Sequence, residues 1–86
     1  MWIVELTFTG TPGRLAARPA HRQRLTDLHG RGAVRMAGPL ADDSGALIVF
    51  DVPDRPALDR LLAADPYLAT PGVGVRHIRR WEPFLT

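Results

Sequence analysis

The sequence predicts an α+β fold in which two helices cover one face of a four-stranded antiparallel sheet. Residues 2–8 alternate between large apolar side chains and smaller or polar ones, which is the period of a strand with one buried face. Residues 46–52 (ALIVFDV) form a short apolar run, which is typical of a strand buried on both faces. Leucines recur at helical spacing after each of these segments, so strands and helices are expected to alternate.

The first helix is expected to begin at Arg18 or Pro19 and to end at Gly30. Residues 9–13 before it contain two glycines and a proline, a composition that ends the first strand in a turn. Proline suits the first turn of a helix, because its missing N–H would have no partner there. Gly30 and Gly32 supply the stop signal at the other end.

His21 is expected on the apolar face of this helix, because it lies one turn before Leu25, with Leu28 and His29 following. A histidine near the start of a helix and facing a sheet suits a general acid or base, since the positive end of the helix dipole favours the neutral imidazole. The alternative is a histidine that is only packed and hydrogen-bonded in the core. For helical position alone, that structural role is the commoner case.

The second half of the chain begins with two predicted strands. Residues 33–40 are a strand candidate that ends in Gly38 and Pro39, and residues 42–45 form a turn before the apolar strand. Gly38 and Pro39 have two interpretations. A glycine lets the backbone approach a ligand closely, whereas a Gly-Pro pair also simply terminates a strand.

A second helix and a last strand complete the chain. Asp54 is a good N-cap with Pro56 in the first turn, and Pro66 ends the helix because the residue before a proline avoids the α conformation. Residues 75–81 form the last strand, so the order is β-α-β-β-α-β, the ferredoxin-like arrangement. The apolar third strand implies that the face away from the helices is apolar too. A second copy of the same sheet is the simplest cover, so we expect a homodimer with its sheets face to face.

The length and composition limit the class of protein. The chain has 86 residues, so we expect one domain over residues 1–86. It contains no cysteine, which excludes disulfides and thiolate metal sites. The apolar start is too short for a membrane span and lacks the basic residues of a signal peptide, so a cytoplasmic location is expected, with no membrane partner.

Asp65 is the carboxylate most suited to work with His21. It follows the leucines of the second helix and precedes Pro66, so it is expected at the negative end of a helix, where a carboxylate needs a donor or a cation. An aspartate that orients a histidine forms a familiar acid–base pair. The alternative is an ordinary solvated aspartate beside a helix-breaking proline.

Nucleic acid, metal and nucleotide cofactors are not expected as ligands. All 11 basic residues are arginine and they are scattered, and the third strand carries aliphatic side chains where an RNA-binding sheet of this order has stacking rings. Arg76, Arg79 and Arg80 are interpreted as a solvated strand face, with an anion site as the alternative. The three histidines lack metal-ligand spacing, and no phosphate-binding or nucleophile motif is present.

Four short motifs together resemble the YciI-like (YCII-related) family. They are ARPAH (residues 17–21), AGPL (37–40), ADPYL (64–68) and RRW (79–81), and the match extends over nearly the whole chain. The resemblance implies a ferredoxin-like fold, a dimeric α+β barrel and an active site built on a paired His21 and Asp65. It also implies that Arg18, Gly38, Pro39 and Tyr67 line the pocket. The segment between AGPL and the third strand is shorter here than in many relatives.

Three functions are compatible with these features. The first is a cofactor-independent enzyme of lyase or isomerase type, in which His21 moves a proton on a small cyclic, enol or carbonyl metabolite and Asp65 orients the imidazole. The second is a dimeric small-molecule binding or regulatory module without chemistry that uses the same pocket. The third is a structural role, in which the dimer surface is the function.

Overall fold

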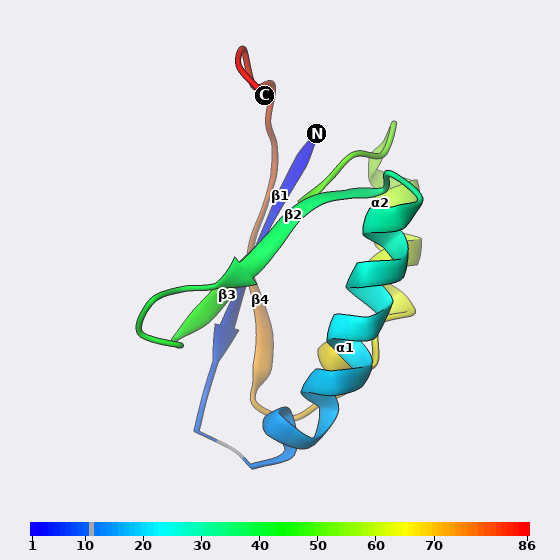
Figure 1. Ribbon diagram of the computed structural model, residues 1–86. Coiled ribbons are helices and arrows are strands. Elements are labelled where there is room, and N and C mark those ends of the chain that lie inside the picture. The colour runs from blue at the N-terminus through cyan, green and yellow to red at the C-terminus, as the bar shows by residue number, and fades with distance from the viewer. Residues whose placement is uncertain (11) are drawn as a thin grey trace.

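The fold is an α+β sandwich of one sheet and two helices, in the order predicted (Figure 1). The computed structural model describes residues 1–10 and 12–86, so Thr11, within the predicted turn at 9–13, lies outside it. The elements are β1 (Trp2–Phe8), α1 (Gly13–Gly30), β2 (Val34–Pro39), β3 (Gly45–Phe50), α2 (Arg55–Ala63), the 3₁₀ helix η1 (Pro66–Ala69) and β4 (Val73–Arg80).

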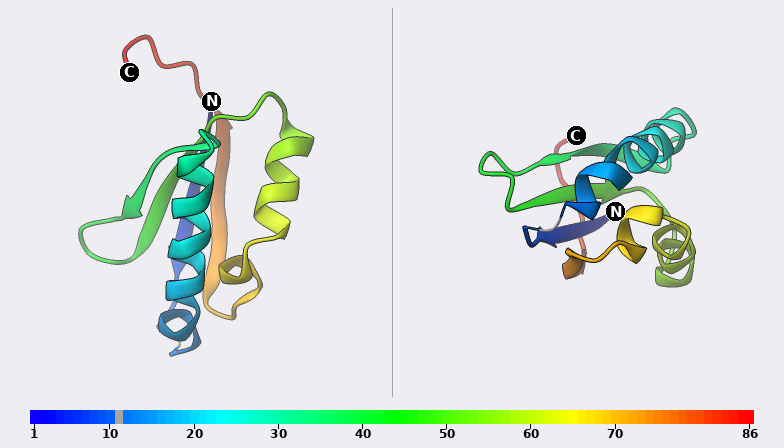
Figure 2. Two further views of the ribbon diagram at one scale, coloured as in Figure 1. Left: turned by 45° about the vertical axis from the view of Figure 1, so that its right-hand side comes forward. Right: turned by 90° about the horizontal axis from the view of Figure 1, so that it is seen from below.

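The four strands form one sheet in the order β2-β3-β1-β4, and every neighbouring pair is antiparallel. Both helices lie on the same face of this sheet (Figure 2). The ferredoxin-like prediction is therefore confirmed. The core lies between the sheet and the helices, and its most buried members are Val4, Leu6, Ile48, Leu58 and Tyr67. No helix in the described part of the chain has the length and apolar character needed to cross a membrane.

The first helix begins five residues earlier than Arg18, at Gly13, so its predicted start is wrong. Arginine, leucine and two alanines at residues 14–17 favour helix strongly enough to extend it past Pro19, which lies inside the helix. The ring of Pro19 removes the hydrogen bond to the carbonyl of Leu15, but Leu15 is exposed, so water can reach this turn. His21 consequently lies in the middle of α1, where the dipole of the helix end does not act on it.

The face of the sheet away from the helices is only partly apolar. In the single chain, Val49 of β3 is 7% exposed and Leu47 is 40% exposed, so burial of this face of β3 under a second sheet stays a prediction. Met36 of β2 is 64% exposed. The arginines of β4 are exposed, and Arg76 lies 3.7 Å from Glu5.

The start of β3 depends on a glycine. A Cβ atom on Gly45 would overlap the backbone carbonyl oxygen of Leu6 on the adjacent strand β1. A Cβ atom on Gly38 of β2 would meet nothing within 4 Å, and Gly38 does not have a positive φ. The two glycines therefore form a matched pair for substitution.

We expect Gly45→Ala to lower the free energy of unfolding by about 1–3 kcal/mol, because the two strands must separate to admit the methyl group. Gly38→Ala is the control and is expected to change it by less than about 0.5 kcal/mol. Urea denaturation followed by circular dichroism measures both. Equal stability of the two variants would show that β1 and β3 are not packed this closely.

Candidate active site

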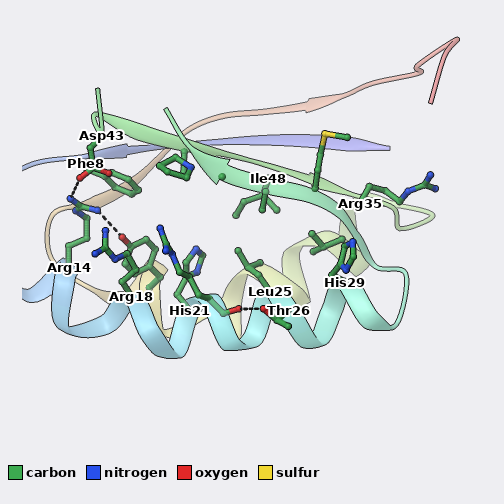
Figure 3. A pocket seen from close by; sticks show the side chains of 18 residues that line it. Phe8, Arg14, Arg18, His21, Leu25, Thr26, His29, Arg35, Asp43 and Ile48 are labelled. Carbon is green, nitrogen blue, oxygen red and sulfur yellow. Dashed lines mark hydrogen bonds and ion pairs between the residues drawn. The ribbon is translucent and has the colours of Figure 1, made fainter. Parts of the chain in front are cut away.

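A pocket of about 610 Å³ lies between α1 and β2, on the face of the sheet that carries the helices (Figure 3). Side chains from the length of α1 line one wall, β2 and β3 supply the other, and Phe8 and Tyr67 close one end. The volume lies in the range of pockets for small molecules. Four of the lining residues are cations, namely Arg14, Arg18 and Arg22 on α1 and Arg35 on β2.

His21 and Asp65 are joined by a hydrogen bond of 2.7 Å between Nδ1 and Oδ2. Both residues are only 5% exposed. The topology makes this contact, because α1 and η1 pack against each other although the two residues are 44 positions apart in the chain. In this low-dielectric setting the hydrogen bond holds the imidazole in one orientation.

Asp65 directly follows the C-cap of α2, and its backbone N–H donates to Leu62 O of that helix, but it also begins η1, which the sequence did not predict. α2 ends at Ala63, with Ala64 as its C-cap. Asp65 is the N-cap of η1, and its Oδ1 accepts a hydrogen bond of 2.9 Å from the backbone N–H of Tyr67. The carboxylate therefore faces the donor end of a helical turn, which stabilises its charge.

The two bonds to Asp65 determine the tautomer of His21. The backbone N–H of Tyr67 can only donate, and an ionised carboxylate can only accept, so the Nδ1–H of His21 donates to Oδ2. In the neutral imidazole, Nε2 then carries the lone pair. His21 lines the pocket and Asp65 does not (Figure 3). Because Nδ1 is bonded to Asp65, we infer that the imidazole edge away from Nδ1 is the one that reaches the pocket.

Tyr67 packs against one face of the His21 ring. Its ring stacks on the imidazole with centroids 4.1 Å apart and planes inclined by 19°, and Phe8 meets it edge-on at 5.7 Å. Tyr67 is fully buried. Aromatic contacts on one face and the bond to Asp65 on one edge leave the imidazole little freedom to rotate.

Arg14 is a pocket residue that the sequence reasoning missed. Its Nη1 donates to the hydroxyl of Tyr67 at 3.1 Å, its Nη2 donates to Asp43 at 2.9 Å, and its guanidinium carbon lies 4.2 Å from the centre of the Phe8 ring. The bonds to Tyr67 first, and to Asp43 second, raise the pKa of Arg14, so it remains a cation. One signal in the sequence could have indicated Arg14 as a pocket residue. Arg14 lies seven residues before His21, so the two side chains share one face of a helix that starts at Gly13.

The structure brings the other residues named by the resemblance together around this pocket. Arg18, Gly38, Pro39 and Tyr67 all line the pocket with His21. The arginines of β4 do not, and neither does His77. His29 lines the end away from Asp65 and is exposed. Across residues 1–10 and 12–86, no three histidine or acidic side chains come together as metal ligands would.

The fold and the pocket define a ferredoxin-like α+β protein with a buried His–Asp pair beside a small-molecule cavity. A profile of the YCII-related domain matches residues 4–82 of the sequence. The chain belongs to the YCII-related domain family, which confirms the resemblance drawn from its motifs.

One solved structure with the same fold is 5-chloro-2-hydroxyhydroquinone dehydrochlorinase (TftG) from Burkholderia phenoliruptrix AC1100, in complex with 2,5-dihydroxybenzoquinone. The two structures align with a TM-score of 0.68 and 17% sequence identity over 95% of this chain and 94% of the other. At this identity the likeness shows the shared fold. No curated protein matches the sequence.

The tautomer of His21 gives a direct test of the pair. In mildly alkaline solution, we expect ¹⁵N-detected NMR of the ring to show hydrogen on Nδ1. In Asp65→Asn the side-chain oxygen can still accept from the Tyr67 N–H, so its amide N–H₂ faces Nδ1 and the hydrogen moves to Nε2. Asp59→Asn, at an exposed ion pair on α2, is the control and leaves the tautomer unchanged. Hydrogen on Nε2 in the unaltered protein would contradict the assignment.

Proposed function

We propose that the protein is a cofactor-independent enzyme of lyase or isomerase type that moves a proton on a small cyclic enol or carbonyl compound. The observation that carries this proposal is the orientation of His21. Its Nδ1 is held by a buried carboxylate, and its other edge meets the pocket. A neutral imidazole in this setting is equipped as a general base, and its charged form is stabilised by Asp65.

The chemistry needs only the chain's own residues. Nε2 takes a proton from the substrate, and the electron pair of the broken bond remains as an enolate. In an elimination, that pair forms a double bond and the leaving group departs from the neighbouring carbon with its own bonding pair. In an isomerisation, the imidazolium returns the proton to another carbon. Asp65 keeps the ring in place and offsets its positive charge in both cases.

The walls of the pocket favour a ring compound with acidic oxygens. Apolar side chains such as Leu25 and Ile48 suit an apolar ring, and Arg14 and Arg18 suit anionic oxygens. TftG supports the same class of compound. Both the 5-chloro-2-hydroxyhydroquinone in its name and the 2,5-dihydroxybenzoquinone in its structure are oxygenated six-membered rings. A non-catalytic binding module would use the same pocket walls. Turnover of the compound therefore distinguishes the enzyme from the binding module, whereas affinity does not.

We also propose that the enzyme acts as a homodimer through the open face of the sheet. Met36 and Leu47 are large apolar side chains that water reaches in the single chain. A charged pair, Glu5 of β1 and Arg76 of β4, borders them on the β4 side. Apolar side chains beside charged groups are common in protein interfaces.

Turnover tests the catalytic proposal. The unaltered protein is incubated with 2-hydroxyhydroquinone and its 5-chloro derivative in D₂O, and deuterium at ring carbons and released chloride are measured. We expect His21→Gln to abolish the protein-dependent rate and Asp65→Asn to lower it by about 10²–10⁴-fold. His29→Gln, a pocket histidine at the other end, is the control and keeps it. A thermal shift with these compounds but no exchange or elimination supports the binding module instead.

Light scattering tests the dimer. We expect the unaltered protein to have twice the mass of one chain at micromolar concentration, and Leu47→Arg to have the mass of one chain, because a guanidinium would be buried without a partner. Leu15→Arg is the matched control, since Leu15 is exposed on α1, away from the sheet. A single-chain mass for the unaltered protein would contradict the proposal.

A further inference from the structure

We propose that Arg14 binds an anionic oxygen of the substrate, and that the Asp43 carboxylate occupies this binding position until the substrate displaces it. The inference rests on the proposed function for the location of the reacting atom, and it adds a second recognition point to the same pocket. It predicts substrates with an ionised oxygen on the side of the ring away from the carbon that faces His21.

Arg14 is a cation that the fold keeps from water. Its side chain is 11% exposed, with the ring of Phe8 against the guanidinium and the Tyr67 hydroxyl on Nη1. These two neighbours are neutral groups, so Asp43 is the anion that compensates its charge. A guanidinium with so little exposed surface is stabilised by an anion in the folded protein, whichever molecule supplies it.

Asp43 does not depend on Arg14 in the same way. Its side chain is 50% exposed, so its carboxylate can be hydrated when it leaves the guanidinium. The backbone of the loop closes without it, through hydrogen bonds from Leu40 N–H to Gly45 O and from Asp43 N–H to Leu40 O. Separation of the pair is therefore unfavourable mainly because it leaves the Arg14 guanidinium without an anion. A substrate oxygen that takes the place of the carboxylate supplies that anion.

The backbone of Asp43 has turn geometry. Its φ of 58° lies in the left-handed region, which aspartate tolerates better than most residues but which is less favourable than ordinary turn geometry. Asp43 lies in the short connection between β2 and β3, at the edge of the pocket (Figure 3). Because Asp43 belongs to neither strand, rotation of its side chain away from Arg14 requires no change in the sheet.

The spacing between Arg14 and His21 fits a substrate with one six-membered ring. The two residues are seven positions apart on α1, which is about 10.5 Å along the helix axis, and Arg18 lies between them on the same face. Tyr67 contacts His21 with its ring and Arg14 with its hydroxyl. The phenol group of Tyr67 therefore spans the distance between the His21 and Arg14 side chains. A substrate ring of similar size beside Tyr67 can contact Nε2 of His21 at one side and Arg14 at the other.

Equilibrium binding of 2,5-dihydroxybenzoquinone tests the proposal. Its hydroxyls are vinylogous carboxylic acids that ionise readily, and it has no leaving group. All variants also carry His21→Gln, and affinity is measured by titration calorimetry. We expect Asp43→Asn to tighten binding about 5-fold, because it removes a competitor of the strength of a half-exposed ion pair. We expect Arg14→Gln to weaken it about 10- to 100-fold, the value of a hydrogen bond to a charged group.

Two controls separate displacement from general charge effects. Asp42→Asn removes the same charge from the same loop but retains the side-chain oxygen that accepts from Ser44, and it is expected to change affinity less than about 2-fold. In the Arg14→Gln background, Asp43→Asn is expected to have no effect. Arg14→Lys, which retains the charge, gives a second comparison if circular dichroism shows that Arg14→Gln does not fold.

Two results would overturn the proposal: affinity of Asp43→Asn no greater than that of its parent, or equal gains from Asp42→Asn and Asp43→Asn. Because the experiment measures binding in a His21→Gln background, its outcome is independent of turnover. If the binding changes occur but His21→Gln retains full turnover in the unaltered background, the catalytic proposal fails and the role of Arg14 stands. If turnover depends on His21 but Asp43→Asn does not change the affinity, the displacement proposal fails and the catalytic proposal stands.

Discussion

The carboxylate of Asp65 is the group on which the pocket depends. One oxygen accepts from the backbone of Tyr67 and so begins the turn η1, and the other accepts from His21 on α1. A single buried anion therefore connects the segment after the second helix to the middle of the first. Because a buried carboxylate without donors is very costly, these two bonds also position η1 against α1.

From Asp65, a continuous set of contacts runs along one wall of the pocket. His21 stacks on Tyr67, Tyr67 accepts a hydrogen bond from Arg14, and Arg14 pairs with Asp43. The two ends differ in a way that suits separate tasks. The Asp65 end is buried and rigid, as proton transfer at a defined atom requires, whereas the Asp43 end is half exposed and can exchange its partner.

Local signals predicted most of the fold, and the exceptions have physical causes. The alternation of residues 2–8 matches β1, and Asp54 caps α2 by accepting from the N–H of Ala57. The predicted start of α1 is wrong because proline favours the first turn of a helix, whereas the residues before Pro19 are strong helix formers and extend the helix past it. The turn η1 is four residues long, too short for a periodic pattern, and it depends on the Asp65 side chain.

The amino-acid sequence by itself determined the order of the elements, the face of α1 that turns inward, and the motifs that mark the family. These follow from periodicity and capping, which act over a few residues. The family motifs imply that His21 pairs with Asp65, but only the tertiary structure gives the geometry of this contact across 44 positions. Only the tertiary structure shows that Arg14 reaches Tyr67 across 53 positions. Contacts of that range result from the packing of whole elements, so no local pattern specifies them, and the tautomer of His21 and the pairing of Arg14 follow from them.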